Sequence, residues 1–107
     1  MIFLAEYTLL AYIPFMATAH QSFDWDERKS AACLADRGFG FEDVIRIFAG
    51  KVIERLDNRR DYGELRVQAA GLIDGVPFMV VYTLRGDVTR IISARKMHLK
   101  EWQKWQE

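Results

Sequence analysis

The sequence predicts an α+β domain in which a short strand and two helices precede an antiparallel β-meander, and a last helix follows it. Three observations predict this class. The hydrophobic period is that of helices up to about residue 50 and becomes the period of two typical of strands after Lys51. Two sequences suited to hairpin turns, Asp74-Gly75 and Arg85-Gly86-Asp87, separate apolar runs. The chain has 107 residues, 50% of them hydrophobic, which is enough for one packed core.

The first elements are a short strand and two helices. Residues 23–25 place two aromatic side chains on one face of an extended segment. Asp26 is suited to be the N-cap of a helix from about Glu27 to Asp36, which Gly38 is placed to end. A second amphipathic helix follows, because apolar residues recur at positions i, i+3, i+4 and i+7, namely Phe41, Val44, Ile45 and Phe48.

Four strands and a helix complete the predicted order. Residues 52–56 and 65–69 alternate between apolar and polar, and residues 76–84 are nearly all apolar, which predicts a central strand buried on both faces. Residues 88–94 form the next strand. From Arg95 to Glu107, apolar residues at three-residue steps predict a helix with one apolar edge, formed by Leu99, Trp102 and Trp105.

Residues 1–21 differ in composition from the rest of the chain, being apolar, aromatic and almost uncharged. A signal peptide would need a basic start, where Glu6 stands instead, although Ala17-Thr18-Ala19 resembles a cleavage site. A membrane span needs about 20 uninterrupted apolar residues, which Glu6 and Pro14 prevent. Two other interpretations are open. Residues 1–21 could form an added strand, or the true start could be Met16, with the residues before it assigned in error. We therefore expect an apolar extension over 1–21, a folded domain over 22–107 and no membrane span.

Charge and cysteine content exclude several classes of protein. The 15 Lys and Arg residues balance 15 Asp and Glu residues, which argues against indiscriminate coating of nucleic acid. A single cysteine, Cys33, forms no intramolecular disulfide and, with two histidines, provides no recognisable metal site. We therefore expect a cytoplasmic protein with no metal and no other cofactor.

The neutral average hides a basic C-terminal stretch. Residues 85–104 contain six Lys and Arg residues against two acidic ones, a local charge of +4. Lys96, Lys100 and Lys104 step by four along one predicted helix row, an arrangement that suits a phosphate backbone. Strict alternation would point Arg90 and Arg95 to opposite faces of their strand unless a β-bulge re-aims one of them. The alternative is a solvated helix face with surface salt bridges.

Several motifs resemble those of the BrnT family of toxins. They are Phe23-Asp24-Trp25-Asp26-Glu27-x-Lys29, Gly38-x-x-Phe41-Glu42-Asp43, Asp61-Tyr62-Gly63-Glu64-x-Arg66 and, above all, Arg90-Ile91-Ile92-Ser93-Ala94-Arg95-Lys96 followed by Glu101. The resemblance runs from about Phe23 to Trp105. It implies a RelE/ParE-like fold and a ribonuclease of a type II toxin–antitoxin system, neutralised by a BrnA-like antitoxin that binds operator DNA.

The sequence departs from the family pattern at two places. Cys33 and Asp36-Arg37-Gly38 replace the family's Asn and Lys-His-Gly at the end of the first helix, so a cation is kept and an imidazole is lost. Trp105 stands where the family has a tyrosine near its C-terminus. Because an indole exchanges no proton, only a stacking role is left to this position.

The resemblance and the charge pattern together give candidate site residues for RNA cleavage without a metal. When the 2′-hydroxyl of RNA attacks the adjacent phosphate, cations must stabilise the extra charge of the transition state. Arg90 and Arg95 match the family motif and take this role, assisted by Lys96 and Arg66. Glu64 and His98 are the candidate general bases. The expected RNA-binding residues are Arg85, Lys100, Lys104, Lys29 and Arg37.

Two other functions are compatible with the same sequence. One is a binding module that has lost catalysis but still holds the antitoxin and takes part in regulating the operon. The other is a toxin of the same fold that poisons DNA gyrase, because one scaffold hosts several functions. The antitoxin is expected to cover the basic face and exposed aromatic residues at Trp102 and Trp105.

Overall fold

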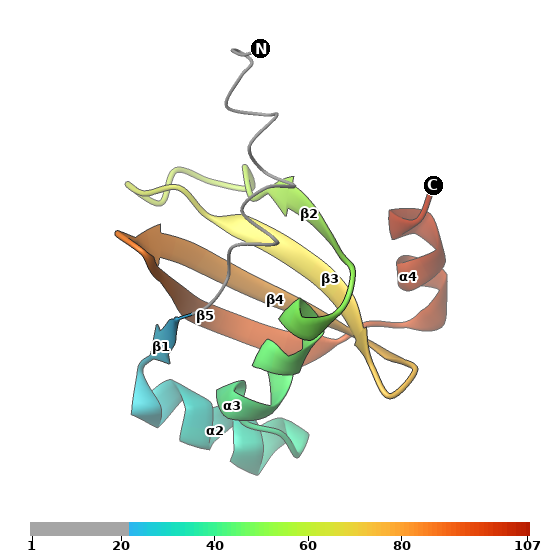
Figure 1. Cartoon of the computed structure of the whole chain (residues 1–107), viewed down its shortest axis with the longest axis horizontal. Helices are drawn as coiled ribbons and strands as arrows, with labels where there is room; N and C mark the ends of the chain where they lie inside the picture. Colours follow the sequence, from blue (N-terminus) through green and yellow to red (C-terminus); the bar gives the residue numbers. More distant parts are fainter. Residues whose placement is uncertain (1–21) are drawn as a thin grey trace.

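The computed structural model describes residues 22–107, which form a five-stranded mixed sheet with helices on both faces (Figure 1). The predicted α+β class is confirmed, and the proposed extension over 1–21 lies outside the described residues. In chain order the elements are β1 (Phe23–Trp25), α2 (Glu27–Arg37), α3 (Phe41–Val44), the 3-10 helix η1 (Ile45–Ala49), β2 (Val52–Leu56), β3 (Val67–Ile73), β4 (Val76–Arg85), β5 (Val88–Lys96) and α4 (Leu99–Trp105).

The sheet has the strand order β1-β5-β4-β3-β2, so β4 is central as predicted. Strands β2 to β5 form an antiparallel meander, whereas β1 pairs with β5 in parallel. The predicted antiparallel meander is therefore confirmed, and the parallel pairing of β1 makes the whole sheet mixed. The alternation of side chains in β1 predicts that Phe23 and Trp25 both face the core. It does not predict the direction in which β1 pairs with a strand more than sixty residues later.

The first helix begins and ends where its capping residues predict. The Asp26 carboxylate accepts hydrogen bonds from the backbone N–H groups of Arg28 and Lys29, at 2.8 and 3.3 Å. Gly38 follows the helix with φ +88°, a left-handed conformation that glycine adopts without steric penalty. The helix therefore ends at Arg37, at the edge of the sheet.

The second predicted helix is only partly α-helical. It is an α-helix over Phe41–Val44 and a 3-10 helix from Ile45. The most deeply buried side chains are Phe41, Val44 and Ile47, at three-residue steps, and the 3-10 helix aligns residues three apart. The main core lies between these helices and one face of the sheet, and Tyr82 is its largest fully buried side chain.

A β-bulge in β5 reverses the alternation of that strand. Val81 pairs with Ser93 and Tyr82 with Ile91, so Ile92 is an extra residue in β5. Ile91 and Ala94 therefore both face the main core. Arg90 and Arg95 consequently lie on the same face of the sheet, the opposite one, which meets the condition on which the predicted arginine pair depended.

The last helix begins later than predicted. Strand β5 continues to Lys96, Met97 is buried, and α4 begins only at Leu99. The predicted row of three lysines on one helix is wrong, because Lys96 belongs to the strand and follows the core-facing register of Ala94. Among residues 22–107, no helix is long and apolar enough to cross a membrane.

Candidate functional site

The candidate site lies on the face of the sheet opposite the main core. We call this surface the open face. It is defined by alternate residues of the three inner strands: Gln68 of β3, Met79, Val81 and Thr83 of β4, and Arg90, Ser93 and Arg95 of β5. Helix α4 covers one end of it, where Trp102 and Trp105 pack against Ala70, Met79 and Met97. The rest of the open face is bordered by polar and cationic side chains.

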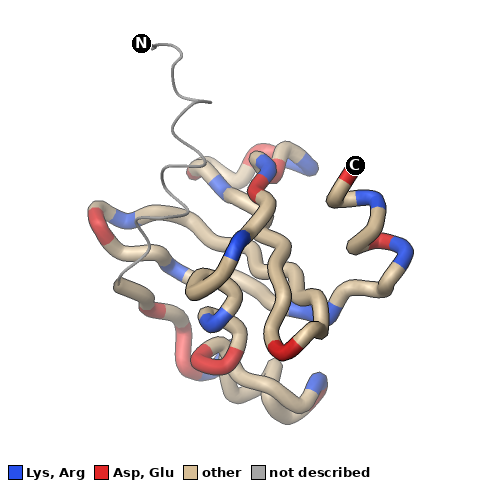
Figure 2. The backbone as a smooth tube through the Cα atoms, turned by 45° about the vertical axis from the view of Figure 1, so that its right-hand side comes forward, with Lys and Arg blue, Asp and Glu red and all other residues tan. Residues whose placement is uncertain are grey.

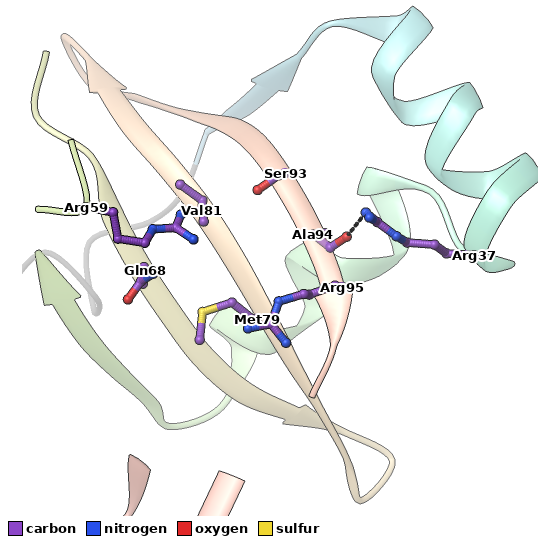
Figure 3. Close-up of a pocket in the computed structure, with 8 residues that line it drawn as sticks. All are labelled: Arg37, Arg59, Gln68, Met79, Val81, Ser93, Ala94 and Arg95. Atoms are coloured by element: carbon purple, nitrogen blue, oxygen red, sulfur yellow. Dashed lines mark hydrogen bonds between the residues drawn. The ribbon is translucent and has the colours of Figure 1, made fainter. Parts of the chain in front are cut away.

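A hollow of about 210 Å³ lies at the middle of the open face (Figure 3). We call it the arginine hollow, because three guanidinium groups from three different elements contribute to it. Arg95 comes from β5, Arg59 from the loop after β2, and Arg37 from the last residue of α2. The full lining consists of Arg37, Arg59, Gln68, Met79, Val81, Ser93, Ala94 and Arg95.

Arg95 is held by a bidentate ion pair with α4. Its two terminal nitrogens donate hydrogen bonds to the Glu101 carboxylate at 2.9 and 2.6 Å. These bonds lower the pKa of Glu101 and raise that of Arg95. Planar pairs of this kind fix orientation as well as distance. The ion pair therefore connects α4 to β5 and sets the direction of the Arg95 side chain, which is 45% exposed.

Arg37 approaches the hollow from the edge of the sheet. Its Nη1 donates a hydrogen bond of 2.9 Å to the carbonyl oxygen of Ala94. Strand β1 pairs only with residues 89–91 of β5, so this carbonyl lies beyond the paired part of that edge. The Arg37 guanidinium thus contacts the backbone of the residue that precedes Arg95, and Arg37 lines the same hollow as Arg95.

A second group of charged side chains lies near the start of β3 and the end of β4. Arg66 Nε is 3.3 Å from one Glu64 carboxylate oxygen, and Arg85 Nη2 is 4.0 Å from the other. Arg66 also stacks over the ring of Tyr62, 4.1 Å from its centroid. Arg90 pairs with Asp24 of β1 at 3.4 Å. The structure therefore brings Glu64 together with Arg66 and Arg85, and it places Arg90 on the same face.

The other predicted site residues do not join this group. His98 is exposed and precedes α4, and Lys100 and Lys104 are exposed on that helix. Lys29 is exposed on α2, where it lines a second hollow of about 210 Å³ that shares Arg37 with the first. Figure 2 shows basic positions along α4 and acidic positions among the helices α2 and α3. Lys96 follows the core-facing register, so it is separated from Arg95 by the plane of the sheet.

A family model described as the ribonuclease toxin BrnT of type II toxin–antitoxin systems matches residues 25–101. This match covers most of the chain, from the end of β1 into α4. The chain belongs to the BrnT family. No curated protein matches it significantly. Membership in the BrnT family confirms the resemblance seen in the sequence, and it identifies the chain as a member of a group of ribonuclease toxins that act in pairs with antitoxins.

In this member of the BrnT family, the structure reveals two functional candidates that sequence reasoning missed. The segment 57–63 reads as a charged, solvated loop, yet the Asp57 side chain is 0% exposed. Arg59 donates to its carboxylate through Nε and Nη2, each at 2.8 Å. These hydrogen bonds are the main cause that lowers the pKa of Asp57 to about 2. The only signal of this ion pair in the sequence is an acidic residue, Asp57, directly after the apolar residue that ends β2.

The aromatic residues of α4 are less available than predicted. Trp102 and Trp105 are half-buried against the sheet, and the Arg55 guanidinium lies 4.1 Å from the centroid of the Trp105 ring. Trp105 therefore stacks on an arginine of its own chain. Cys33 is free and buried, and burial raises the pKa of its thiol. Residues 22–107 contain no cluster of three His, Cys, Asp or Glu side chains suited to a metal ion.

Proposed function

We propose that the protein is a toxin that cleaves RNA without a metal ion, using the open face as its active surface. The observation that carries the proposal is the bulge at Ile92, which brings Arg90 and Arg95 to one face of the sheet, where Arg95 and Arg59 line the same hollow. Several fixed guanidinium groups on one surface suit a phosphate chain and the extra negative charge of a phosphoryl transition state. We further propose that this α+β domain has the RelE/ParE-like fold that the resemblance implies.

The proposed reaction needs only groups of the protein and the RNA. Glu64 takes the proton of the 2′-hydroxyl, whose oxygen attacks the adjacent phosphorus. The bond to the 5′-oxygen breaks, and that oxygen takes a proton from water, leaving a 2′,3′-cyclic phosphate and a 5′-hydroxyl end. Arg90 and Arg95 stabilise the charge that develops on the phosphoryl oxygens. Glu64 is favoured over His98 as the base because it lies within ion-pair distance of Arg66 and Arg85, whereas His98 precedes α4 and lies outside this group.

The proposed partner is a BrnA-like antitoxin that covers the open face, with operator DNA bound only through the toxin–antitoxin complex. The basic side chains around the hollow favour acidic or helical segments of the antitoxin. Exposed Lys100 and Lys104 extend this basic surface along α4 and are proposed to contact flanking RNA phosphates. Action on RNA places the protein in the cytoplasm.

The test compares two variants that both break the Arg95–Glu101 ion pair. Arg95→Ala removes the guanidinium, whereas Glu101→Gln keeps it and removes only the carboxylate charge. With the purified full chain, a single-stranded RNA and excess chelator, we expect Arg95→Ala to lower the cleavage rate by about 100-fold or more, and Glu101→Gln to lower it far less. Mapped ends should carry a cyclic phosphate and a 5′-hydroxyl.

Expression in cells separates the alternatives. The wild type should arrest growth and generate new RNA ends, and co-expression of a BrnA-like antitoxin, sought in a neighbouring reading frame, should restore growth. Intact RNA and unaffected growth, with a partner that still co-purifies, would instead establish the binding module. DNA damage without RNA cleavage would establish the gyrase-directed toxin.

A further inference from the structure

Asp57 and Arg59 form an ion pair with an unusual distribution of exposure. The carboxylate is completely buried at the end of β2, whereas the Arg59 side chain is 65% exposed. Asp57 accepts three hydrogen bonds from Arg59, two from the guanidinium and one of 3.3 Å from the backbone N–H. Its own backbone N–H donates to the Arg66 carbonyl at 2.8 Å. A carboxylate fixed in this way determines the direction of the guanidinium that it binds.

The Arg59 guanidinium that Asp57 holds points toward the arginine hollow. Figure 3 shows Arg59 extending toward β4 from one side and Arg95 from the other, with Gln68 of β3 next to Arg59. The Glu101 carboxylate raises the pKa of Arg95, and the positive charge of Arg59 acts in the opposite direction, which means that the two cations oppose each other in the folded protein. Holding like charges close together is unfavourable unless an anion joins them. A guanidinium has five N–H donors, and Asp57 engages two of those on Arg59.

We propose that the arginine hollow binds one phosphate group of RNA, that Arg59 is a phosphate-binding residue, and that Asp57 is the residue that positions it. The inference deepens the proposed function and rests on it for the identity of the ligand. Arg37 and Arg95 complete the cationic lining, and the side chains of Gln68 and Ser93 offer further hydrogen bonds. Each of the three guanidinium groups is already fixed by a partner in the chain, so little reorganisation accompanies binding.

The experiment measures binding of a single-stranded RNA whose 2′-hydroxyls are methylated, because this probe cannot be cleaved by attack of the 2′-oxygen. Fluorescence anisotropy of the full chain gives Kd and its dependence on salt. We expect Arg59→Ala to weaken binding about tenfold or more and to reduce the slope of log K against log salt by about 0.7, the value for one phosphate contact on a single strand. Arg46→Ala is the matched control, since Arg46 pairs with Asp74 and lies outside the hollow.

A second comparison tests the positioning role of Asp57. Asp57→Asn should weaken binding, and combining it with Arg59→Ala should weaken binding no further than Arg59→Ala alone. If Arg59→Ala fails to fold because it leaves a buried charge unpaired, the double variant removes that charge and is compared directly with Asp57→Asn. Circular dichroism establishes that each variant is folded before binding is measured.

The binding and cleavage experiments together distinguish a failure of this inference from a failure of the proposed function. Unchanged Kd and salt slope in Arg59→Ala would overturn the inference, as would absence of binding by the wild type. A wild type that cleaves RNA while Arg59→Ala binds normally overturns the inference and leaves the proposed function intact. A wild type that binds through Arg59 but cleaves nothing overturns the proposed function and supports the phosphate site.

Discussion

Replacing Asp57 with asparagine should reduce the stability of the protein near neutral pH by an amount that disappears in acid. In the folded protein the pKa of Asp57 is lowered from 3.8 to about 2, chiefly by the hydrogen bonds from Arg59. At about 1.4 kcal/mol per pKa unit, this difference corresponds to about 2.5 kcal/mol of stabilisation at neutral pH. Because Arg59 is 65% exposed and solvent screens its charge, we expect a measured effect of about 1–2 kcal/mol.

The sign of the pH dependence follows from the lowered pKa. The folded state binds the Asp57 proton more weakly than the unfolded state, so the stabilisation is complete above about pH 5 and is lost as the pH falls through 3.8 toward 2. Roughly half of it is lost by pH 3. Glu101 also has a lowered pKa and contributes its own acid sensitivity, but that contribution is the same in wild type and variant and cancels in their difference.

Urea unfolding of the full chain at several pH values between 3 and 7 measures this difference. The control is Asp61→Asn in the same loop, where the side chain only accepts a bond from the Gly63 N–H and asparagine can do the same. We expect the control to change the free energy of unfolding by less than about 0.5 kcal/mol. A wild-type advantage over Asp57→Asn that is absent at pH 7, or that stays constant down to pH 3, would refute the electrostatic account.

Three further predictions concern the fold. Gly71→Ala should lower the free energy of unfolding by about 1–3 kcal/mol in a urea titration, because the new Cβ would lie 3.0 Å from Ile47 Cβ and 3.1 Å from Val52 Cγ1; no loss would show that η1 can move away. Asp26→Ala should cost about 1 kcal/mol by removing the cap of α2, and full recovery by Asp26→Ser would support that cause. Cys33 should react with a thiol reagent far more slowly in the native protein than in urea, since it is buried and its thiol pKa is raised; equal rates would contradict the burial.

Most of the fold was predictable because its signals are local. The cap at Asp26, the left-handed Gly38 and the two-residue turn at Asp74-Gly75, with φ values of +51° and +80°, each act over a few residues. The parallel pairing of β1 depends instead on contacts with a strand far away in the sequence. The change to a 3-10 helix at Ile45 accompanies the close packing of Ile47 against Gly71 of β3, a strand that follows later in the chain. Tertiary packing of this kind produces no local sequence pattern from which it could be predicted.

The candidate site was predictable in its residue types more than in its geometry. The family motif predicted Arg90 and Arg95 as site residues. Their common direction depends on the bulge at Ile92, which no residue type in that strand predicts. Arg59 was missed because a buried and a solvated aspartate look the same in a sequence. Whether Asp57 is exposed depends on the packing of the segment that returns from the loop to β3, beginning with the bond between Asp57 and Arg66.

The zero net charge of the chain agrees with this site once the pairing of its cations is considered. Arg59 and Arg95 are each matched by a carboxylate, of Asp57 or Glu101, while both arginines line the hollow. Pairing lowers the long-range positive potential that would attract any polyanion, and this disfavours non-specific binding. It does not use all the N–H donors, and those that remain are fixed in direction before a ligand arrives. A neutral protein can therefore bind a phosphate by geometry where a more basic one would bind it by charge alone.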